Sequence, residues 1–198
     1  GRRLSYAIIP PPAGAADAPP VIVPAKTVRE VSRALADYVG DVTLEVSASG
    51  VRFTLGETVI WSKVIDGAFP DYIRLIPRSW EVEAIMDRAL VAAAVRRVSL
   101  MADDKARSMK FSLAPGWLTL QVNNTQAGIA VEEVEIEYDG PPHDTGFNSR
   151  YALDALGMTE ADRIVFRQVD SGSPARIEPE ASDPEAGQVL GIIMPLRV

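Results

Sequence analysis

The chain contains no cysteine and only one histidine among its 198 residues. The lack of cysteine excludes a disulfide framework and a thiolate zinc site, and it favours a reducing compartment, so we expect a cytoplasmic protein. The longest apolar runs, 89–95 and 189–195, fall far short of the roughly 20 residues that a membrane-spanning helix needs. No signal peptide is visible. We therefore expect no membrane partner.

The sequence also lacks the short motifs of common active sites. It has no G-x-x-x-x-G-K-[ST] loop, no G-x-G-x-x-G and no G-x-S-x-G. His143 follows two prolines in an expected exposed turn, with neither a nucleophile nor a second metal ligand in view. Glu133, Glu135 and Glu137 alternate with apolar residues, which is typical of a half-solvated strand. We predict a protein that is not an enzyme, with no catalytic residue, metal or cofactor.

The net charge of −7 argues against nucleic acid as a partner, because phosphate binding depends on lysine and arginine. Net charge, however, does not say where the basic residues lie. The question is therefore which surfaces carry them.

A structural unit recurs three times along the chain, at about 60-residue spacing. Each copy has a short strand, an amphipathic helix and three further strands, and the copies cover residues 21–77, 80–138 and 143–198. Such units predict an α+β fold with antiparallel sheets and helices on one side. If two copies make one closed domain, the first copy lacks its mate, and we expect this chain to be the last part of a longer protein.

Hydrophobic periodicity and end signals place the helices. We predict one helix over 26–39, ended by Gly40, a second from an Asp87 N-cap to about 98, and a third from an Asn148 N-cap to about 157. Alternation and turn residues predict the strands. Their expected ranges are 4–9, 21–23, 42–47, 51–55, 59–65, 81–85, 108–113, 117–123, 130–138, 144–147, 163–169, 175–178 and 189–194.

The helical faces carry the basic residues. On the second helix, we expect a buried face of Leu90, Val91, Ala94, Val95 and Val98, opposite an alanine-padded basic face without carboxylates. On the first helix, Val28, Val31, Leu35 and Tyr38 share the apolar face, and the basic residues lie beside Glu30 and Asp37. The third helix offers Arg150, with Asp154 one turn later as an expected partner. Two interpretations stay open here: ordinary solvated faces, or one shared basic surface.

Four stretches carry a resemblance to a known family. They are Ser62–Tyr72 followed by Arg74, then Gly1–Leu4, Gly146–Asn148 with Tyr151, and Ile193–Val198. In this register, they resemble the bacterial sliding clamp, the β subunit of DNA polymerase III. The stretches span essentially the whole chain, which makes coincidence a poor explanation.

The resemblance implies a DNA-clamp fold, with antiparallel sheets outside and helices lining an inner face. The family forms a homodimeric ring with three similar domains per chain. This chain would be the second half of the middle domain, residues 1–78, plus the C-terminal domain, residues 79–198. The resemblance further implies a processivity factor that encircles duplex DNA without reading its base sequence. The alternative is a clamp-like peptide-binding module that does not encircle DNA.

The resemblance also implies three sets of residues. The DNA-facing set is Lys26, Arg29, Arg33, Arg88, Arg96, Arg97 and Arg150. A dimer seam would retain Leu100 and Met101, although residues 126–131 replace most of the acidic run that the family uses there. A groove for short hydrophobic motifs of the polymerase III catalytic subunit, the clamp loader and repair proteins comprises Gly1, Arg3, Leu4, Pro70, Arg74, Leu75, Asn148, Tyr151, Gly172, Pro174, Ile192, Ile193, Met194, Pro195, Leu196 and Arg197. From the residues alone, 192–194 would be a plain core strand.

Overall fold

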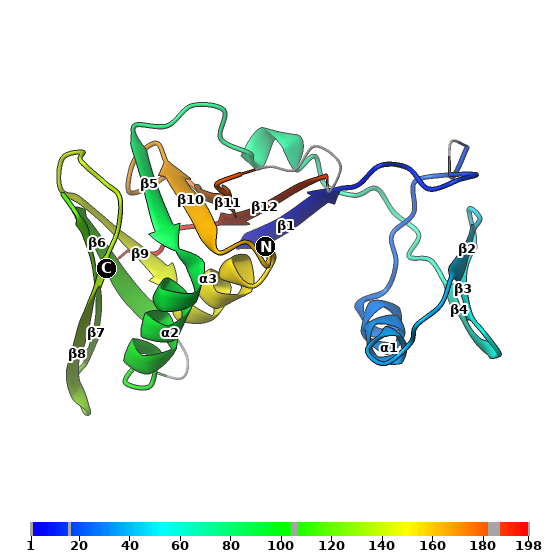
Figure 1. Ribbon diagram of the computed structural model, residues 1–198, viewed down its shortest axis with the longest axis horizontal. Coiled ribbons are helices and arrows are strands. Elements are labelled where there is room, and N and C mark those ends of the chain that lie inside the picture. Colours follow the sequence, from blue (N-terminus) through cyan, green and yellow to red (C-terminus); the bar gives the residue numbers. More distant parts are fainter. Residues whose placement is uncertain (1, 16, 104–106, 182–186, 198) are drawn as a thin grey trace. The chain divides into compact units, whose positions relative to one another are not determined.

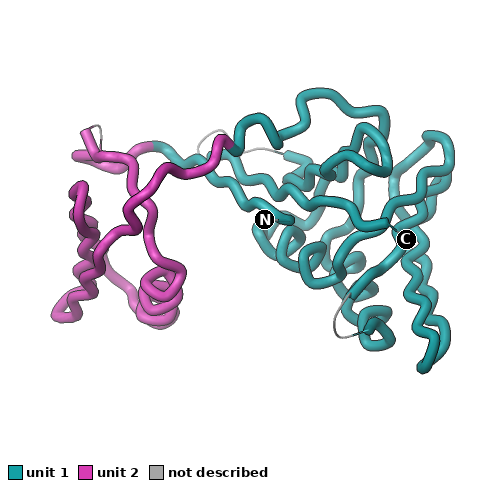
Figure 2. Tube along the Cα trace, turned by 180° about the vertical axis from the view of Figure 1, so that it is seen from behind, with its two compact units in different colours: residues 1–10, 72–198 teal, residues 11–71 magenta. Residues whose placement is uncertain are grey.

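The computed structural model describes residues 2–15, 17–103, 107–181 and 187–197. The chain divides into two compact units (Figure 2). Unit 1 comprises Gly1–Pro10 and Tyr72–Val198, and unit 2 comprises Pro11–Asp71.

Unit 2 is one helix on a small antiparallel sheet. Helix α1 (Ala25–Leu35) accompanies strands β2 (Val42–Val46), β3 (Gly50–Leu55) and β4 (Thr58–Lys63), in the order β2-β3-β4. The Thr27 hydroxyl donates to the Ser62 hydroxyl at 2.8 Å and ties the helix to β4. The helix ends at Leu35, four residues before the predicted end. The expected strand 21–23 is reduced to a single bridge between Ile22 and Ile65.

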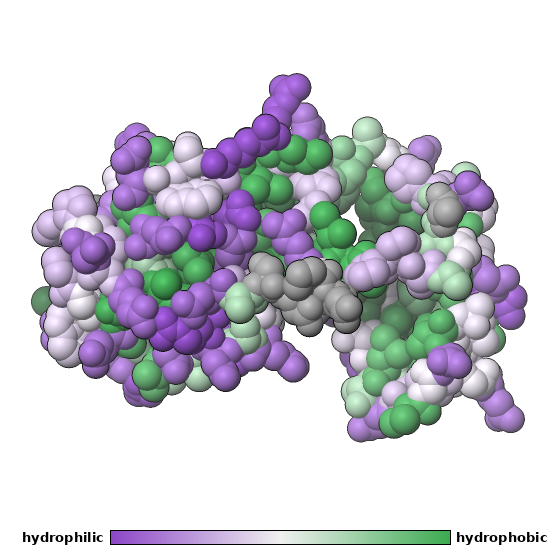
Figure 3. All heavy atoms as spheres, turned by 45° about the horizontal axis from the view of Figure 1, so that its top comes forward, coloured by the Kyte–Doolittle hydropathy of each residue, from purple (hydrophilic) through white to green (hydrophobic). Residues whose placement is uncertain are grey.

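Unit 2 leaves much apolar surface exposed, as the green patches of Figure 3 show. Val28 and Leu35, predicted to face the core, are 53% and 39% exposed. One helix on three strands encloses too little volume to cover them. Among the described residues of unit 2, the buried apolar side chains are Val31, Val51 and Leu55.

The described residues of unit 1 form two antiparallel sheets. The first has the order β1-β12-β11-β10-β5, built from β1 (Arg3–Ile8), β12 (Gln188–Ile193), β11 (Ala175–Pro179), β10 (Arg163–Gln168) and β5 (Val82–Asp87). The second has the order β8-β7-β6-β9, built from β8 (Gly128–Glu135), β7 (Trp117–Asn124), β6 (Ser108–Ala114) and β9 (His143–Asn148). A short 3-10 helix, η1 (Ile73–Leu75), precedes β5.

The two longer helices of unit 1 lie side by side against the sheets (Figure 1). Helix α2 (Arg88–Ser99) begins at the predicted cap, where Asp87 Oδ1 accepts from Leu90 N–H at 2.8 Å. Helix α3 (Ser149–Leu156) begins at the other predicted cap, where Asn148 Oδ1 accepts from the amides of Arg150 and Tyr151. Both caps satisfy amides that a helix start leaves without partners.

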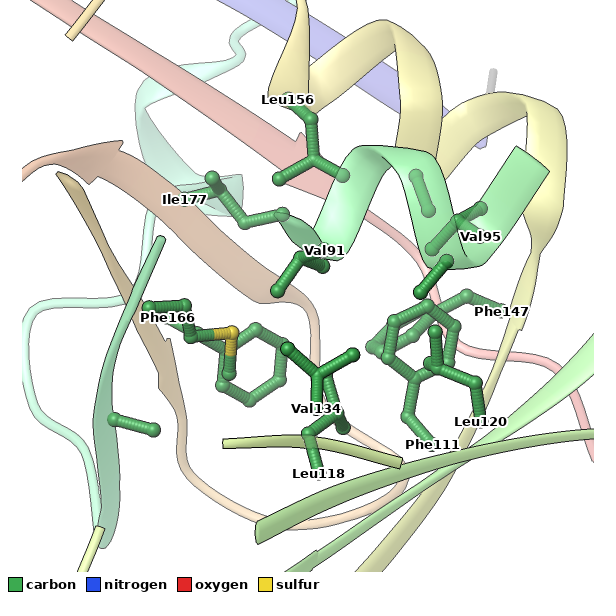
Figure 4. Close-up of a cluster of buried hydrophobic side chains, with 14 of the residues drawn as sticks. Val91, Val95, Phe111, Leu118, Leu120, Val134, Phe147, Leu156, Phe166 and Ile177 are labelled. Atoms are coloured by element: carbon green, nitrogen blue, oxygen red, sulfur yellow. The ribbon is translucent and has the colours of Figure 1, made fainter. Parts of the chain in front are cut away.

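The core of unit 1 lies between these helices and both sheets (Figure 4). Phe147 is fully buried and meets Phe111 and Phe166 edge-on, with ring centroids 5.3 and 6.1 Å away. Val91 and Val95 of α2 point into the same cluster. The predicted α+β architecture is confirmed. The predicted buried face of α2 is wrong at Leu90, which is 57% exposed. Ala92, one of the alanines expected to pad the basic outer face, is buried.

The sequence copies exchange their first strands. β5 opens the second copy but pairs with β10 of the third, whereas β9 opens the third copy and pairs with β6 of the second. The second and third copies therefore share one core.

Candidate functional site

The two ends of the described chain meet in the five-stranded sheet. Strands β1 and β12 are antiparallel neighbours, with Leu4 opposite Ile192 and Arg3 opposite Ile193. The amide of Met194 donates to the carbonyl of Arg2 at 2.9 Å and extends this pairing. Two segments of the predicted groove, which come from opposite ends of the described chain, thus lie side by side.

Alternation along β12 separates its two isoleucines. Ile193 is 1% exposed and belongs to the core cluster beneath the helices. Ile192, its neighbour, points to the opposite face, which we call the outer face, together with Leu4 across the strand pair. The side chain of Ile193 therefore packs in the core, and its role in the groove stays a prediction. The side chain of Ile192 is 2% exposed and forms the floor of this outer face.

Arg3 joins the edge strand to α3. Its guanidinium carbon lies 4.7 Å from the centre of the Tyr151 ring, and the guanidinium pairs with the carboxylate of Asp154. The sequence predicted Arg150 as the partner of Asp154, and the structure instead brings Arg3 from the far end of the chain. Tyr151 is half-buried, so its ring offers Arg3 one open face.

A cavity of about 690 Å³ opens beside the end of β12. The Leu196 amide donates to the Gly146 carbonyl at 2.7 Å and fixes the 195–197 segment against β9. At the cavity, Lys110 pairs with Asp144 at 2.8 Å, and hydrogen bonds from Lys110 and then Ser112 hold the pKa of Asp144 below its usual value. The residues that line the cavity are Lys110, Asp144, Thr145, Gly146, Ser171, Gly172, Pro195, Leu196 and Arg197.

Sequence reasoning did not find Lys110 and Asp144. They lie on β6 and β9, and no local spacing connects two strands so far apart in the chain.

The turn between β10 and β11 places two predicted groove residues, Gly172 and Pro174. Asp170 Oδ1 accepts from the Gly172 amide at 2.8 Å, and this bond, followed by that of the Ser173 hydroxyl, lowers the pKa of Asp170. Pro174 is half-buried and precedes Ala175, the partner of Ile193 on β11. The turn therefore lies next to the end of β12.

Helix η1 supplies Arg74 and Leu75, and Leu75 is 48% exposed. Just before it, Tyr72 packs against Tyr6 of β1 with ring centroids 5.5 Å apart. Tyr6 lies on the outer face, two residues along from Leu4. Of the remaining predicted groove residues, Pro70 is exposed in unit 2 and Gly1 lies outside the described residues.

His143 does not lie in an exposed turn, contrary to the prediction. It is half-buried in β9, and its Nε2 lies 2.9 Å from Oε1 of the fully buried Gln168. The Gln168 amide donates to the Ser173 carbonyl at 2.8 Å. This histidine thus belongs to a hydrogen-bonded network that supports the β10–β11 turn.

The basic residues of α2 differ in what they contact. Arg96 is exposed, whereas Arg97 pairs with Glu132 of β8, with Nε to Oε2 at 3.0 Å, and this pairing lowers the pKa of Glu132. Arg88 is half-buried and donates from Nε to the Ala161 carbonyl at 2.7 Å. Helix α2 itself carries no carboxylate on this face, as predicted, but Arg97 is neutralised from outside the helix. The neutralising carboxylate comes from a strand, which a helical wheel does not include.

The other predicted DNA-facing residues lie on the surfaces of their own units. Lys26 and Arg29 are exposed on α1, and Arg33 pairs with Glu30 at 2.7 Å. Arg150 is exposed at the start of α3.

The two predicted seam residues follow α2. Leu100 is 85% exposed, and Met101 packs partly against the core while its carbonyl accepts from the Asn124 side chain at 3.0 Å. Leu100 thus presents an apolar side chain to solvent.

The described residues contain neither a membrane-spanning helix nor a metal-binding cluster. No helix there has the length and apolar character needed to cross a membrane. In the same part of the chain, no three histidine, aspartate or glutamate side chains gather where they could hold a metal ion.

Family models decide which family this arrangement represents. Residues 1–71 match the central domain of the DNA polymerase III beta subunit, and residues 73–197 match its C-terminal domain. This chain belongs to the DNA polymerase III beta subunit family. The family resemblance seen in the sequence is confirmed.

Individual family members support the assignment. The beta sliding clamp of Caulobacter vibrioides is 46% identical over 198 residues, which is 100% of this chain and 52% of that protein. The beta sliding clamp of Escherichia coli K12 is 29% identical over 178 residues, 90% of this chain and 48% of that protein. The chain thus spans about half the length of the curated clamps it matches.

Solved clamp structures confirm the fold. A Caulobacter crescentus beta sliding clamp superposes with a TM-score of 0.91 at 45% identity, covering 100% of this chain and 52% of that one. A Bartonella birtlesii sliding clamp superposes with a TM-score of 0.91 at 38% identity, with the same coverage. The antiparallel sheets and helices described above are therefore those of the clamp fold.

Proposed function

We propose that this chain is part of a DNA polymerase processivity factor, a sliding clamp that encircles duplex DNA and tethers the replicative polymerase and other partners. Residues 1–78 would form the second half of the middle domain, and residues 79–198 the C-terminal domain. The whole protein would be a cytoplasmic homodimeric ring, with Leu100 and Met101 at its seam, and it would have no catalytic residue. The family membership of the whole chain supports this proposal.

The part of this function that the chain itself would carry is peptide binding in a groove. One observation carries it: predicted groove residues distant in sequence are brought together in unit 1. Leu4 and Ile192 are cross-strand partners, Arg3 contacts Tyr151, and the Met194 amide donates a hydrogen bond to the carbonyl of Arg2, the residue before Arg3. A methionine and aliphatic surface adapts to varied apolar side chains, and arginine at its edge can fix a peptide carboxylate or carbonyl.

Ligands bound by relatives point the same way. The Caulobacter crescentus clamp structure holds polyethylene glycol at its proposed beta-motif tethering region, and the Bartonella birtlesii clamp is bound to griselimycin. Occupancy of a tethering region by a flexible chain supports a groove that accepts extended ligands.

A peptide titration tests the proposal. A Gln-Leu-Ser-Leu-Phe peptide should bind the chain saturably, and a Met194→Ala/Arg74→Ala variant should bind about tenfold more weakly or worse. A Met101→Ala/Arg163→Ala variant alters the same residue types away from the groove and should bind like the wild type. If a folded wild-type sample shows no saturable binding, this chain does not carry the groove function.

A clamp-like module that binds peptides without encircling DNA is the second candidate. One observation favours it: Glu132 neutralises Arg97, and the side chain of Arg88 is held at the Ala161 carbonyl, so fewer arginines of α2 can reach phosphates. Salt-dependent DNA association of the full-length protein separates the two candidates. An Arg96→Glu/Arg97→Glu change should weaken association of a ring-forming clamp and leave a pure peptide-binding module unaffected.

A further inference from the structure

The groove floor continues sideways into a cluster of charged residues. Across the outer face, directly opposite residues on successive strands form one row: Leu4, Ile192, Arg176, Arg167 and Glu83. Opposite residues in antiparallel strands share a face of the sheet. The apolar half of this row is therefore the floor described above, and the charged half lies immediately beside it.

The charged half is a closed network. Glu178, 8% exposed, accepts from Arg176 Nε at 3.1 Å and Nη2 at 2.5 Å, and it also pairs with Arg167. Arg167 donates to Glu83 as well, from Nε at 2.7 Å. Two cations and two anions balance each other here, and each guanidinium is fixed by more than one bond. Burial and the nearby Arg167 lower the pKa of Arg176. Such a partly buried network fixes geometry more than it adds stability.

Both arginines also reach the segment 72–80, which runs from η1 to β5 over the outer face (Figure 1). Arg176 Nη1 lies 3.5 Å from the Pro77 carbonyl oxygen, and the guanidinium of Arg167 lies 4.3 Å from the centre of the Trp80 ring. The Glu81 amide then donates to the Gln168 carbonyl at 3.1 Å. The network therefore anchors the C-terminal end of this segment to β10 and β11.

The same segment carries Arg74 and Leu75 in η1. Its internal backbone bonds are few: Leu75 N–H to the Tyr72 carbonyl at 2.9 Å and Ile76 N–H to the Ile73 carbonyl at 3.3 Å. A single 3-10 turn of this length does not hold its shape without tertiary contacts. Tertiary contacts of the whole segment, including those at its C-terminal end, therefore contribute to holding η1 in place.

We propose that Arg176 and Trp80 are positioning residues, which hold the 72–80 segment so that Leu75 and Arg74 are ordered before a peptide arrives. The inference rests on the proposed peptide-binding function. Segments that are ordered only on binding cost affinity, so a pre-ordered segment strengthens binding without touching the ligand. Arg176 is 15% exposed in its side chain and its donors are directed at Glu178 and Pro77, which distinguishes it from a contact residue.

Two variants test this, with the Gln-Leu-Ser-Leu-Phe peptide as probe. Arg176→Ala removes the bond to Pro77, and Trp80→Ala removes the stacking partner while leaving the carboxylates paired. Each should raise the peptide Kd by about three- to tenfold through the ordering cost. In the absence of peptide, amide hydrogen exchange at Leu75 and Ile76 should accelerate in both variants. Arg176→Lys keeps one cationic donor and should fall between Arg176→Ala and the wild type.

Arg163→Ala is the matched control, because Arg163 also lies on β10 and pairs with two carboxylates, those of Glu137 and Glu180, neither of which belongs to the 72–80 segment. Its Kd and exchange rates should equal those of the wild type. Unchanged exchange at Leu75 and Ile76 in folded Arg176→Ala and Trp80→Ala would overturn the inference, as would accelerated exchange with an unchanged Kd. If the wild type itself fails to bind peptide, the proposed function fails, while the exchange data still report whether these residues order the segment. If Arg176→Ala does not fold, Trp80→Ala and Arg176→Lys decide.

Discussion

Arg3 at the start of β1 covers the Tyr151 ring of α3 from 4.7 Å and continues to the carboxylate of Asp154. An edge strand is thereby joined to a helix by a cation–π contact and an ion pair in addition to its ladder to β12. Because Leu4 follows directly, the same contacts fix one wall of the proposed groove.

Removing this connection should cost a modest amount of stability. Asp154→Ala should lower the free energy of unfolding by less than about 1 kcal/mol, since both charged groups remain partly exposed. Arg3→Ala should cost about 0.5–1 kcal/mol more, because it also loses the aromatic contact. Urea unfolding of both single variants and the double variant measures the coupling. Full additivity would show that Arg3 and Asp154 do not interact in solution.

The aromatic centre of unit 1 should be far more sensitive. Phe147→Ala should lower the free energy of unfolding by about 3–5 kcal/mol, because the side chain is completely buried between two other rings. Trp117→Ala, at a side chain that is 49% exposed, serves as the comparison and should cost much less. Chemical denaturation of the whole chain, monitored by near-ultraviolet circular dichroism, measures the free energy of unfolding of both variants. Equal losses would contradict the placement of the core.

Acid should loosen the turn that carries Gly172. The pKa of Asp170 is lower in the folded chain than in the unfolded chain, so the ionised carboxylate favours folding. This contribution is complete above the ordinary aspartate pKa of about 3.9 and is lost as the pH falls through the lower folded value. Carboxylates titrate between roughly pH 5 and pH 2. Over this range, the free energy of unfolding of Asp170→Asn should therefore fall less than that of the wild type.

Urea unfolding at several pH values provides the measurement, with Glu57→Gln at the β3–β4 turn as the control substitution. A pH dependence in Asp170→Asn that matches the wild type would exclude Asp170 as a source of acid sensitivity.

The two neighbouring arginines of α2 should contribute unequally to DNA binding in the full-length protein. Arg96→Ala should reduce the slope of log K against log salt by about 1, whereas Arg97→Ala should reduce it less, because Glu132 already neutralises Arg97. Glu132→Gln should strengthen association at low salt. Titrations over a salt series measure these slopes, and equal slopes for the two arginine variants would show that the ion pair opens on DNA.

Hydrogen exchange should separate the two units. Amides of α1 should exchange faster than those of α2, because α1 rests on a small sheet with few buried side chains while α2 contacts a continuous core. Mass spectrometry of the wild-type chain at neutral pH is sufficient. Similar protection of the two helices would indicate that unit 2 is stabilised by more than its own contacts.

The sequence was a good guide to local structure, and its limits were those of local information. The caps at Asp87 and Asn148 were found because the N-cap residue type is itself the cause of the helix start. Strand β12 was placed within a residue at each end, because apolar runs bounded by polar segments are visible without knowing the partner strand.

Pairing across the chain was the part that could not be obtained in this way. Arg3 with Asp154, Arg97 with Glu132 and the row through Arg176 each join elements distant in sequence. Neither a helical wheel nor the alternation along a strand takes account of residues on other elements. For a related reason, the family resemblance identified the segment that contains Ile193 but not that its side chain packs in the core.

The pairing of β1 with β12 has a consequence for biosynthesis. β1 leaves the ribosome before β12 does, so β1 has no ladder partner while the chain between these two strands is made. Closing so long a loop is slow compared with forming the local hairpins of β6 with β7 or β3 with β4. The floor of Leu4 and Ile192 therefore forms only after β12 has been made, and a chain terminated before β12 would keep its helices but lack the floor of the proposed groove.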